Sequence, residues 1–376
     1  MCDVIAEHLL EIEELKGNYR GIFGVVRAVD GVTLTVDVRE VMGLVGESGC
    51  GKSTLAQLIS GSPSPLLHYE SGKILVDGVD IYKTDPEVFR TEIKCKRMSY
   101  VPQASMDSLN PVKRIRDFVL DVVEERTSKK RMIFKIRDFV IDVAGEGINK
   151  KPLTLEPFAR IRNFFICAIE NRLKRKSVRK ETLKMAGDHL EKLGLDRCVL
   201  DRYPHELSGG MKQRVVIGIS TLWNPKLLII DEPTSALDVT TQKRVIESLV
   251  NLKKMGIIES MLFISHDITV LGQLCDRCAV MYGGKIVEVD RMDEILNNPK
   301  HPYTRMLISS IVSYDPTRMG KGGLKSIPGS PPDLRNPPEG CRFYPRCELC
   351  SDRCKSKDPP LKPVGNGVVA CWREAG

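Results

Sequence analysis

The chain has 376 residues, of which 42% are hydrophobic and 28% are charged, a balance typical of a globular protein with a substantial core. Its length allows one large domain or two. No stretch reaches the about 20 apolar residues that a membrane-spanning helix requires. The first ten residues lack the basic and apolar runs of a secretory signal, so we expect a cytoplasmic protein whose membrane contact is at most peripheral.

Charge and cysteine are both unevenly distributed. The net charge is +8, yet the segment Val112–Lys180 alone carries 19 Lys or Arg against 9 Asp or Glu. Five of the twelve cysteines lie beyond residue 340. Because a reducing cytosol keeps thiols free unless a metal or catalysis uses them, the tail is a candidate metal site rather than a disulfide framework.

The first predicted elements are strands around residues 32–38 and 41–45, the second of them entirely buried in character. The loop Gly46–Thr54 follows directly, with the sequence GESGCGKST, and then Leu55, Leu58 and Ile59 recur at helical spacing. A strand, a glycine-rich loop and a helix in this order are the context of a phosphate-binding loop.

The loop matches the pattern G-x-x-x-x-G-K-[ST] in full. Glycines let backbone N–H groups turn inward around phosphate oxygens, Lys52 adds a point charge, and the Ser53 hydroxyl is a ligand for Mg²⁺. The positive end of the following helix faces the same phosphates. We therefore expect the ATP contacts here to come from Gly46, Ser48, Gly49, Cys50, Gly51, Lys52, Ser53 and Thr54.

A short unit then occurs three times, at residues 115–122, 136–143 and, more loosely, 161–168. Its apolar positions follow i, i+3, i+4, i+7, so each copy is predicted to be a helix with one apolar face. Two interpretations stay open: packing within a helical subdomain, or an added docking surface. In the second, the surplus of Lys and Arg favours contact with anionic lipid.

Two further buried strands end in polar residues. Residues 227–230 lead into Asp231 and Glu232, and residues 261–264 lead into Ser265 and His266. Apolar runs separated by helical segments predict a largely parallel sheet. At its carboxyl edge Asp231 is placed to hold Mg²⁺, and Glu232 to polarise the attacking water as general base.

The string Leu207–Arg214, LSGGMKQR, shortly precedes the second of these strands. With it the chain resembles the ABC ATPase family, over residues 19 to 288. Ser208, Gly209 and Gly210 form a second anion site at a helix start. In the family this site closes over the γ-phosphate bound by an opposite subunit, so the resemblance implies that two ATP molecules are sandwiched between two such domains.

The resemblance also implies roles for single residues. Tyr19 lies where the family stacks an aromatic ring on adenine, and Gln103 matches a glutamine that senses Mg²⁺ and water. Asp238, in Ser235-Ala236-Leu237-Asp238, belongs to a loop that crosses the dimer interface. His266 matches a histidine that contacts the γ-phosphate and orients the catalytic glutamate. The expected catalytic set is thus Lys52, Gln103, Glu232 and His266, with Mg²⁺ held by Ser53, Gln103 and Asp231.

The tail contains HPYTR from residue 301, IPGSPPDL from residue 327 and then the cysteine cluster. This order resembles the C-terminal extension of the oligopeptide/dipeptide importer ATPases. The resemblance implies that Cys341, Cys347, Cys354 and Cys371 hold a [4Fe-4S] cluster, with Cys350 an extra cysteine outside the pattern. Four thiolates also suit Zn²⁺, so the identity of the metal stays open.

Together these features predict an α/β fold. It comprises a P-loop NTPase core of the ABC ATPase type over residues 1–290, with an N-terminal antiparallel β subdomain and an enlarged helical subdomain over about 104–222. A small cysteine-rich extension follows over residues 291–376.

The predicted function is ATP hydrolysis that drives import of oligopeptides, dipeptides or a related solute such as an oligosaccharide or nickel. The implied partners are a second, paralogous ATPase subunit, two permeases at the cytoplasmic face of the membrane and an extracytoplasmic binding protein. The alternative is a soluble ABC ATPase acting on nucleic acid or ribosomes. A single cassette with an importer-type tail favours the importer, so no nucleic-acid partner is expected.

Overall fold

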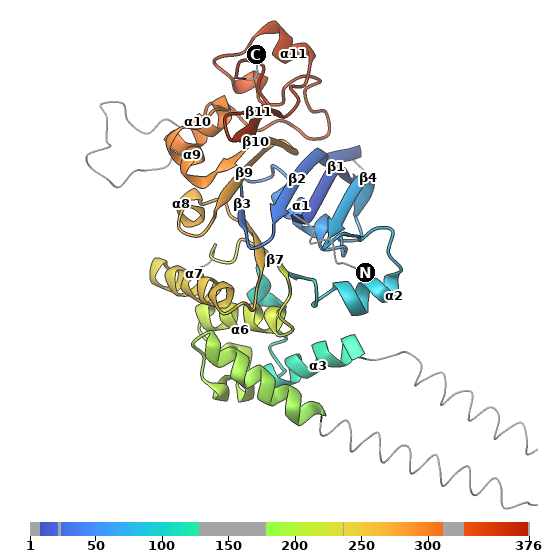
Figure 1. The fold of residues 1–376 in the computed structure, drawn as a ribbon, viewed down its shortest axis with the longest axis vertical. Helices are drawn as coiled ribbons and strands as arrows, with labels where there is room; N and C mark the ends of the chain where they lie inside the picture. Colours follow the sequence, from blue (N-terminus) through green and yellow to red (C-terminus); the bar gives the residue numbers. More distant parts are fainter. Residues whose placement is uncertain (1–7, 22–23, 128–177, 236, 311–326, 375–376) are drawn as a thin grey trace, which may run out of the picture.

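The computed structural model describes residues 8–21, 24–127, 178–235, 237–310 and 327–374 (Figure 1). Its strands are β1 (His8–Gly21), β2 (Gly24–Asp37), β3 (Val41–Val45), β4 (Leu67–Val76), β5 (Val79–Asp80), β6 (Met98–Val101), β7 (Leu227–Asp231), β8 (Ser260–Ile264), β9 (Arg277–Tyr282), β10 (Lys285–Arg291), β11 (Lys362–Val364) and β12 (Gly367–Val369). Its labelled helices are α1 (Lys52–Ile59), α2 (Pro86–Val88), α3 (Ile115–Thr127), α6 (Gly209–Thr221), α7 (Val239–Lys254), α8 (Ile268–Leu271), α9 (Met292–Asn297), α10 (Pro302–Ser309) and α11 (Asp352–Ser356). A further helix is described over residues 178–192.

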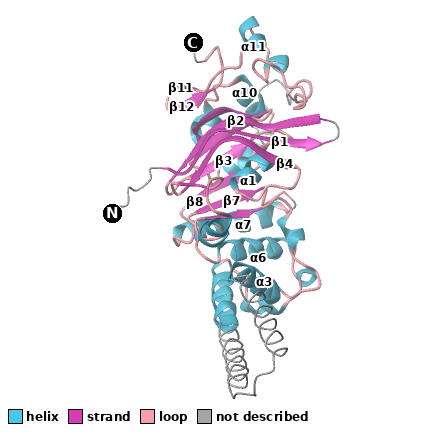
Figure 2. Ribbon diagram, turned by 90° about the vertical axis from the view of Figure 1, so that its right-hand side faces the viewer, coloured by secondary structure: helices cyan, strands magenta, loops and turns pink. Residues whose placement is uncertain are grey.

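The described strands form two sheets. One is antiparallel, in the order β2-β1-β4-β5, and the other has the order β11-β12-β10-β9-β3-β8-β7-β6. Figures 1 and 2 show the antiparallel sheet beside α1, with α3 and α6 at one end of the molecule and the C-terminal extension at the other. The predicted antiparallel subdomain and α/β core are both present.

The second sheet lies between two apolar layers. In β3, Val41 and Val45 join the core on one face, whereas Met42 and Leu44 join the core on the other. β3, β7 and β8 are buried at every position, as expected for parallel strands covered on both faces. Helices α6 and α7 contribute to the first layer, and α1 with the antiparallel sheet contributes to the second.

The prediction of a largely parallel sheet holds for only part of it. The neighbours from β9 through β3, β8 and β7 to β6 are parallel. Beyond β9 the sheet is antiparallel, because β10 returns beside β9 as a hairpin and β12 then pairs with β10. The C-terminal extension therefore continues the sheet of the core.

The first copy of the repeated unit forms the predicted helix, α3. Ile115 and Val119 are fully buried, and Phe118 and Val122 pack against the same core, so the copy has one apolar face. The second and third copies, at 136–143 and 161–168, lie outside the described residues, as does most of the basic segment. Within the described ranges, none of the helices combines the length and apolar character needed to span a membrane.

A buried histidine gives the helical subdomain an expected sensitivity to acid. His189 lies in the helix over 178–192 and its Nε2 is 2.8 Å from Thr221 Oγ1. Burial, assisted by Lys192, lowers the pKa of His189 from 6.5 to about 4. The unfolded chain therefore binds more protons between these values, so stability falls as the pH drops below 6.5, by about 2 kcal/mol for this residue at pH 5.

Urea unfolding of the wild type and of His189→Gln, at pH 7.5 and pH 5, measures this effect. The glutamine amide can still donate to Thr221, yet it does not titrate. The variant is expected to lose about 2 kcal/mol less than the wild type between the two pH values. Equal losses would show that His189 does not carry the acid sensitivity.

Candidate nucleotide site

The loop that joins β3 to α1 has the backbone of an anion cradle. Gly49 and Gly51 have positive φ angles of 78° and 108°, which non-glycine residues rarely adopt. Space is equally restrictive: a Cβ on Gly51 would lie 2.2 Å from the Ala28 carbonyl oxygen, and one on Gly46 would lie 2.1 Å from that of Met281. The glycines are therefore required by the shape of the loop.

Lys52 opens α1 directly after this loop and is 5% exposed. Its Nζ donates to the carbonyl oxygens of Gly46 at 2.8 Å and Glu47 at 3.0 Å, so the ammonium group lies inside the curl of the loop. Cys50 is buried behind it, and burial raises the pKa of its thiol. The cysteine therefore contributes its backbone to the loop rather than a reactive side chain.

A cavity of about 340 Å³ lies over the loop, a size within the range of ligand pockets. It is lined by Tyr19, Val26, Ala28, Ser48, Gly49, Gly51, Lys52, Ser53, Thr54, Gln103, Glu232 and Leu334. Most of the predicted contact residues thus share one cavity, and the Tyr19 hydroxyl lies 3.3 Å from Thr54 Oγ1. Gly46 and Cys50 belong to the loop but do not line the cavity.

Sequence reasoning missed three lining residues: Val26 and Ala28 of β2, and Leu334. Leu334 belongs to the extension, and its carbonyl oxygen accepts a hydrogen bond of 2.9 Å from the Arg27 N–H. The segment IPGSPPDL indicated an importer-type C-terminal extension, but nothing in the sequence indicated that this segment lines the nucleotide cavity.

Asp231 ends β7 beside the cavity and is 1% exposed. Among the described residues, none forms a hydrogen bond to either of its carboxylate oxygens. Burial raises the pKa of this group to about 6, the Ser53 hydroxyl opposes the rise, and the neighbouring Glu232 adds to it. A buried carboxylate with unpartnered oxygens, next to a hydroxyl and above a phosphate loop, fits a Mg²⁺ ligand.

Glu232 joins two predicted partners. Its Oε2 accepts from Gln103 Nε2 at 3.2 Å, and its Oε1 lies 3.3 Å from His266 Nδ1. Its backbone has a φ of 46°, a left-handed conformation that costs a non-glycine residue about 1–3 kcal/mol. The three residues follow β6, β7 and β8, so the shared carboxyl edge of these parallel strands brings them together.

The second predicted anion site begins α6. Ser208 is its N-cap, with Oγ accepting from the Met211 N–H at 3.3 Å, and Asp238 caps α7 in the same way through the Thr241 N–H at 3.0 Å. The two helices pack closely: a Cβ on Gly210 would lie 2.2 Å from Thr241 Cγ2. Ser208, Gly209, Gly210 and Asp238 do not line the nucleotide cavity, so within this chain the two anion sites are separate.

The four predicted cluster ligands line a different, small cavity of about 20 Å³ in the extension: Cys341, Cys347, Cys354 and Cys371. Cys350 is not among its lining residues. No group of three or more His, Cys, Asp or Glu side chains in the described part of the chain is arranged to hold a metal ion. The thiols therefore converge, without the spacing of a bound ion.

The sequence matches two known protein families. Residues 29–235 match the family described as ABC transporter, and residues 287–354 match the family described as oligopeptide/dipeptide transporter, C-terminal region. The chain belongs to the ABC transporter family. The resemblance expected from the motifs is thereby confirmed, and this ABC protein is an ATPase with the predicted ABC cassette fold.

Named relatives of this ABC protein match it along almost its whole length. The dipeptide transport ATP-binding protein DppD of Caldanaerobacter subterraneus subsp. tengcongensis is 36% identical over 365 residues, which cover 96% of each chain. The oligopeptide transport ATP-binding protein OppD of Bacillus subtilis is 34% identical and covers 97% of this chain and 88% of its own. The dipeptide transport ATP-binding protein DppF of Escherichia coli is 32% identical, covering 98% and 95%.

Solved structures agree on the fold. A dimeric bacterial ABC transporter cassette superimposes with a TM-score of 0.54 at 19% identity, over 75% of this chain and 98% of its own. A nucleotide-free ATP-binding cassette from an ABC transporter gives 0.56 at 22% identity, over 80% and 98%. At these identities the likeness concerns the ABC cassette fold alone.

Proposed function

We propose that this chain binds MgATP in the cavity over residues 46–54 and hydrolyses it to energise import of oligopeptides or dipeptides. The match of residues 287–354 to the peptide-transporter C-terminal region carries the proposal. The named relatives are peptide transport ATP-binding proteins, so the nucleic-acid alternative is not favoured. The partners would be a second, paralogous ATPase subunit, two permeases at the cytoplasmic face of the membrane and an extracytoplasmic binding protein.

Different residues around the cavity would bind the phosphates, the adenine and the Mg²⁺ ion. The N–H groups of the loop would surround the phosphates, and Lys52 would exchange its bonds to the Gly46 and Glu47 carbonyls for bonds to phosphate oxygens. Tyr19 would lie against the adenine. Ser53, Gln103 and Asp231 would hold Mg²⁺, whose charge offsets that of the β- and γ-phosphates when it is bound.

Hydrolysis requires a base beside the attacking water. Glu232 would accept a proton from that water as its oxygen bonds to the γ-phosphorus and ADP leaves. Gln103, which donates to one carboxylate oxygen, and His266, which lies 3.3 Å from the other, would orient the base. Ser208, Gly209, Gly210 and Asp238 would complete the site of the opposite subunit, because none of them lines the cavity of their own chain.

Reconstitution tests the transport function. The chain would be assembled with the permeases and the ATPase subunit encoded beside it, in proteoliposomes supplied with the binding protein. ATP-dependent uptake of a labelled oligopeptide, and none with AMP-PNP, is the expected result. Uptake of an oligosaccharide or of nickel in place of peptides would overturn the substrate assignment while leaving the ATPase assignment standing.

We also propose that Cys341, Cys347, Cys354 and Cys371 hold a [4Fe-4S] cluster. Their convergence on one cavity that Cys350 does not line supports this ligand set. A metal bound by four cysteines would add a further constraint to a segment rich in proline and poor in apolar residues.

Anaerobically purified protein is therefore expected to be brown, with a broad visible absorption that bleaches on reduction. Cys354→Ser should remove the colour, whereas Cys350→Ser should keep it. Colourless wild-type protein with one equivalent of zinc would make this a zinc site instead.

The basic segment Val112–Lys180 suggests peripheral contact with an anionic leaflet, where each Lys or Arg gains about 1 kcal/mol. Liposome sedimentation with and without anionic lipid tests this hypothesis. Binding that survives deletion of residues 131–151 would contradict it and leave packing as the role of the repeats.

A further inference from the structure

The extension reaches the phosphate loop through a buried ion pair. Arg346 Nη1 lies 2.7 Å from Glu47 Oε2, and Nη2 lies 3.1 Å from Glu47 Oε1. The side chains are 6% and 22% exposed. Two parallel N–H···O bonds in a site with little water make a strong and direction-specific contact. Glu47 is the residue between Gly46 and Ser48, so this contact acts on the loop itself.

The remaining donors of Arg346 are used as well. Nε donates to the Pro328 carbonyl oxygen at 2.7 Å, and Nη1 also donates to the Tyr282 hydroxyl at 3.2 Å. One planar guanidinium thereby joins three segments: the extension, the end of β9 and the phosphate loop. A lysine ammonium cannot reproduce this fork.

The backbone of Glu47 is fixed from both sides. Its N–H donates to the Tyr303 hydroxyl at 2.9 Å, and its carbonyl oxygen accepts from Lys52 Nζ at 3.0 Å. Tyr303 in turn packs in an aromatic cluster with Tyr282 and Phe343, with ring centroids 4.5 and 5.4 Å away. The position of Glu47 therefore also influences where the Lys52 ammonium rests.

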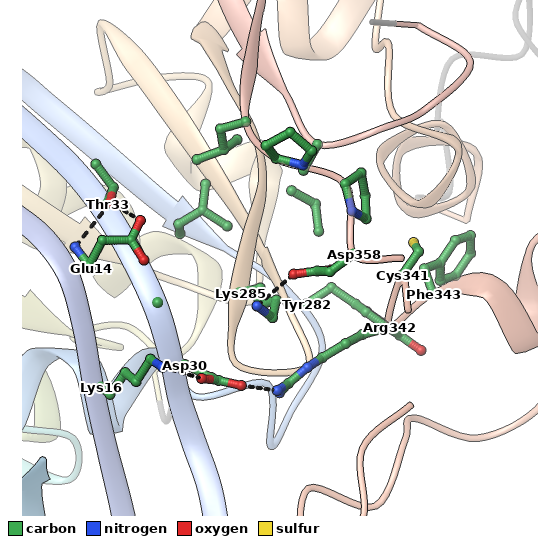
Figure 3. A pocket seen from close by; sticks show the side chains of 17 residues that line it. Glu14, Lys16, Asp30, Thr33, Tyr282, Lys285, Cys341, Arg342, Phe343 and Asp358 are labelled. Carbon is green, nitrogen blue, oxygen red and sulfur yellow. Dashed lines mark hydrogen bonds and ion pairs between the residues drawn. The ribbon is translucent and has the colours of Figure 1, made fainter. Parts of the chain in front are cut away.

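A second arginine of the extension supports the same loop indirectly. Arg342 bonds to Asp30 and to the Gly283 carbonyl oxygen, and Figure 3 shows its guanidinium meeting Asp30, which Lys16 approaches from β1. The next residue, Gly284, donates its N–H to the Cys50 carbonyl oxygen at 2.8 Å. The extension thus contacts the phosphate loop directly at Glu47 and, through Gly283 and Gly284, indirectly at Cys50.

We propose that Arg346 is a positioning residue for nucleotide binding: by holding Glu47, it keeps the phosphate loop in the shape that receives ATP. The extension is then a working part of the nucleotide site. This inference rests on the proposed role of the loop in binding ATP. Arg342 and Arg346 lie in the segment Cys341–Cys347, so order in the cysteine site is coupled to order in the loop.

Nucleotide affinity of the purified full-length chain tests this proposal, with a fluorescent ATP analogue and Mg²⁺. Arg346→Met is expected to raise Kd and the KM for ATP about tenfold, because one half of a buried pair is left without its partner. The kcat, measured together with KM in the transporter assembled with the paralogous subunit, should stay within about twofold, since the groups at Glu232 are unchanged. Glu47→Gln, which preserves shape, should act in the same direction. The Kd of the double variant should be no higher than that of the weaker-binding single variant, because the two side chains act through one shared contact.

The matched control is Arg291→Met. Arg291 forms a similar two-bond pair with Asp293, at 3.0 and 3.0 Å, but is exposed, so Kd should not change. Iron or zinc content should equal that of the wild type in every variant. Lys52→Ala serves as the reference for the loop and should weaken binding.

Two results would overturn this inference alone. Additive effects of Arg346→Met and Glu47→Gln on Kd would show that the pair does not position the loop. An unchanged Kd in Glu47→Gln would show the same. The Glu47→Gln measurement also tests the inference if Arg346→Met does not fold. If Lys52→Ala leaves Kd unchanged, the loop is not the ATP site, and the proposed function fails together with this inference.

Discussion

Glutamine in place of Glu232 is expected to stop ATP turnover while leaving ATP bound. The amide has the size of the carboxylate and can keep the contacts to Gln103 and His266, now 3.2 and 3.3 Å. It cannot accept the proton of the attacking water. Loss of a general base lowers kcat by about 10²–10⁴-fold, whereas the Kd for ATP should stay near that of the wild type.

The bound ATP should also trap a dimer, because the second anion site of each chain would stay closed over nucleotide that is not consumed. Size-exclusion chromatography of this chain mixed with the paralogous ATPase subunit and MgATP is expected to show a peak at the combined mass of the two subunits for Glu232→Gln. The wild-type mixture should elute mainly as separate subunits. Glu247→Gln, an exposed glutamate on α7, is the control and should turn over normally. Normal turnover by Glu232→Gln in an assembled transporter would refute the assignment of the base.

The convergence around Glu232 could be predicted because it follows from strand topology. Gln103 was assigned only through the resemblance to the ABC ATPase family. Asp231 and His266, in contrast, each come just after a predicted buried strand, and the carboxyl ends of parallel strands share one edge. The sequence pattern therefore indicated their proximity without any knowledge of distances. The left-handed backbone of Glu232 could not be foreseen, since no glycine or asparagine marks it.

The contact between the extension and the phosphate loop could not be predicted from the sequence, for a physical reason. Arg346 and Glu47 are 299 positions apart, and an arginine in a tail rich in proline and cysteine has no periodicity that would identify it as buried. The pairing of β12 with β10 is equally non-local. Such contacts depend on how the finished sheet and the extension pack together, and short-range patterns carry no information about that.

The largest effect on the loop itself is expected from Gly51→Ala. Gly51 has a φ of 108°, and a Cβ there would meet the Ala28 carbonyl oxygen at 2.2 Å. That oxygen belongs to the backbone of β2, so it cannot swing away as the end of a flexible side chain would. The loop must rebuild around the new methyl group, and Lys52, the next residue, must move with it.

Gly49→Ala is the matched comparison in the same loop. Gly49 also has a positive φ, 78°, but none of the described residues places an atom within 4 Å of a Cβ built there. Alanine at this position should destabilise the fold only by the cost of a left-handed backbone, about 1–2 kcal/mol. At Gly51 the clash with backbone adds to that cost, and we expect a total loss of about 4 kcal/mol, in the range that marks a severe structural conflict.

Urea unfolding and ATP-analogue binding on the two purified variants separate these costs. Gly51→Ala should lower the free energy of unfolding by at least about 2 kcal/mol more than Gly49→Ala does. It should also weaken nucleotide binding about 100-fold, because the N–H groups of a displaced loop and Lys52 no longer point toward the phosphates. Gly49→Ala should weaken binding about tenfold or less. If both variants bind and unfold alike, the positive φ alone dictates glycine in this loop, and its close packing against β2 has no part in shaping the phosphate site.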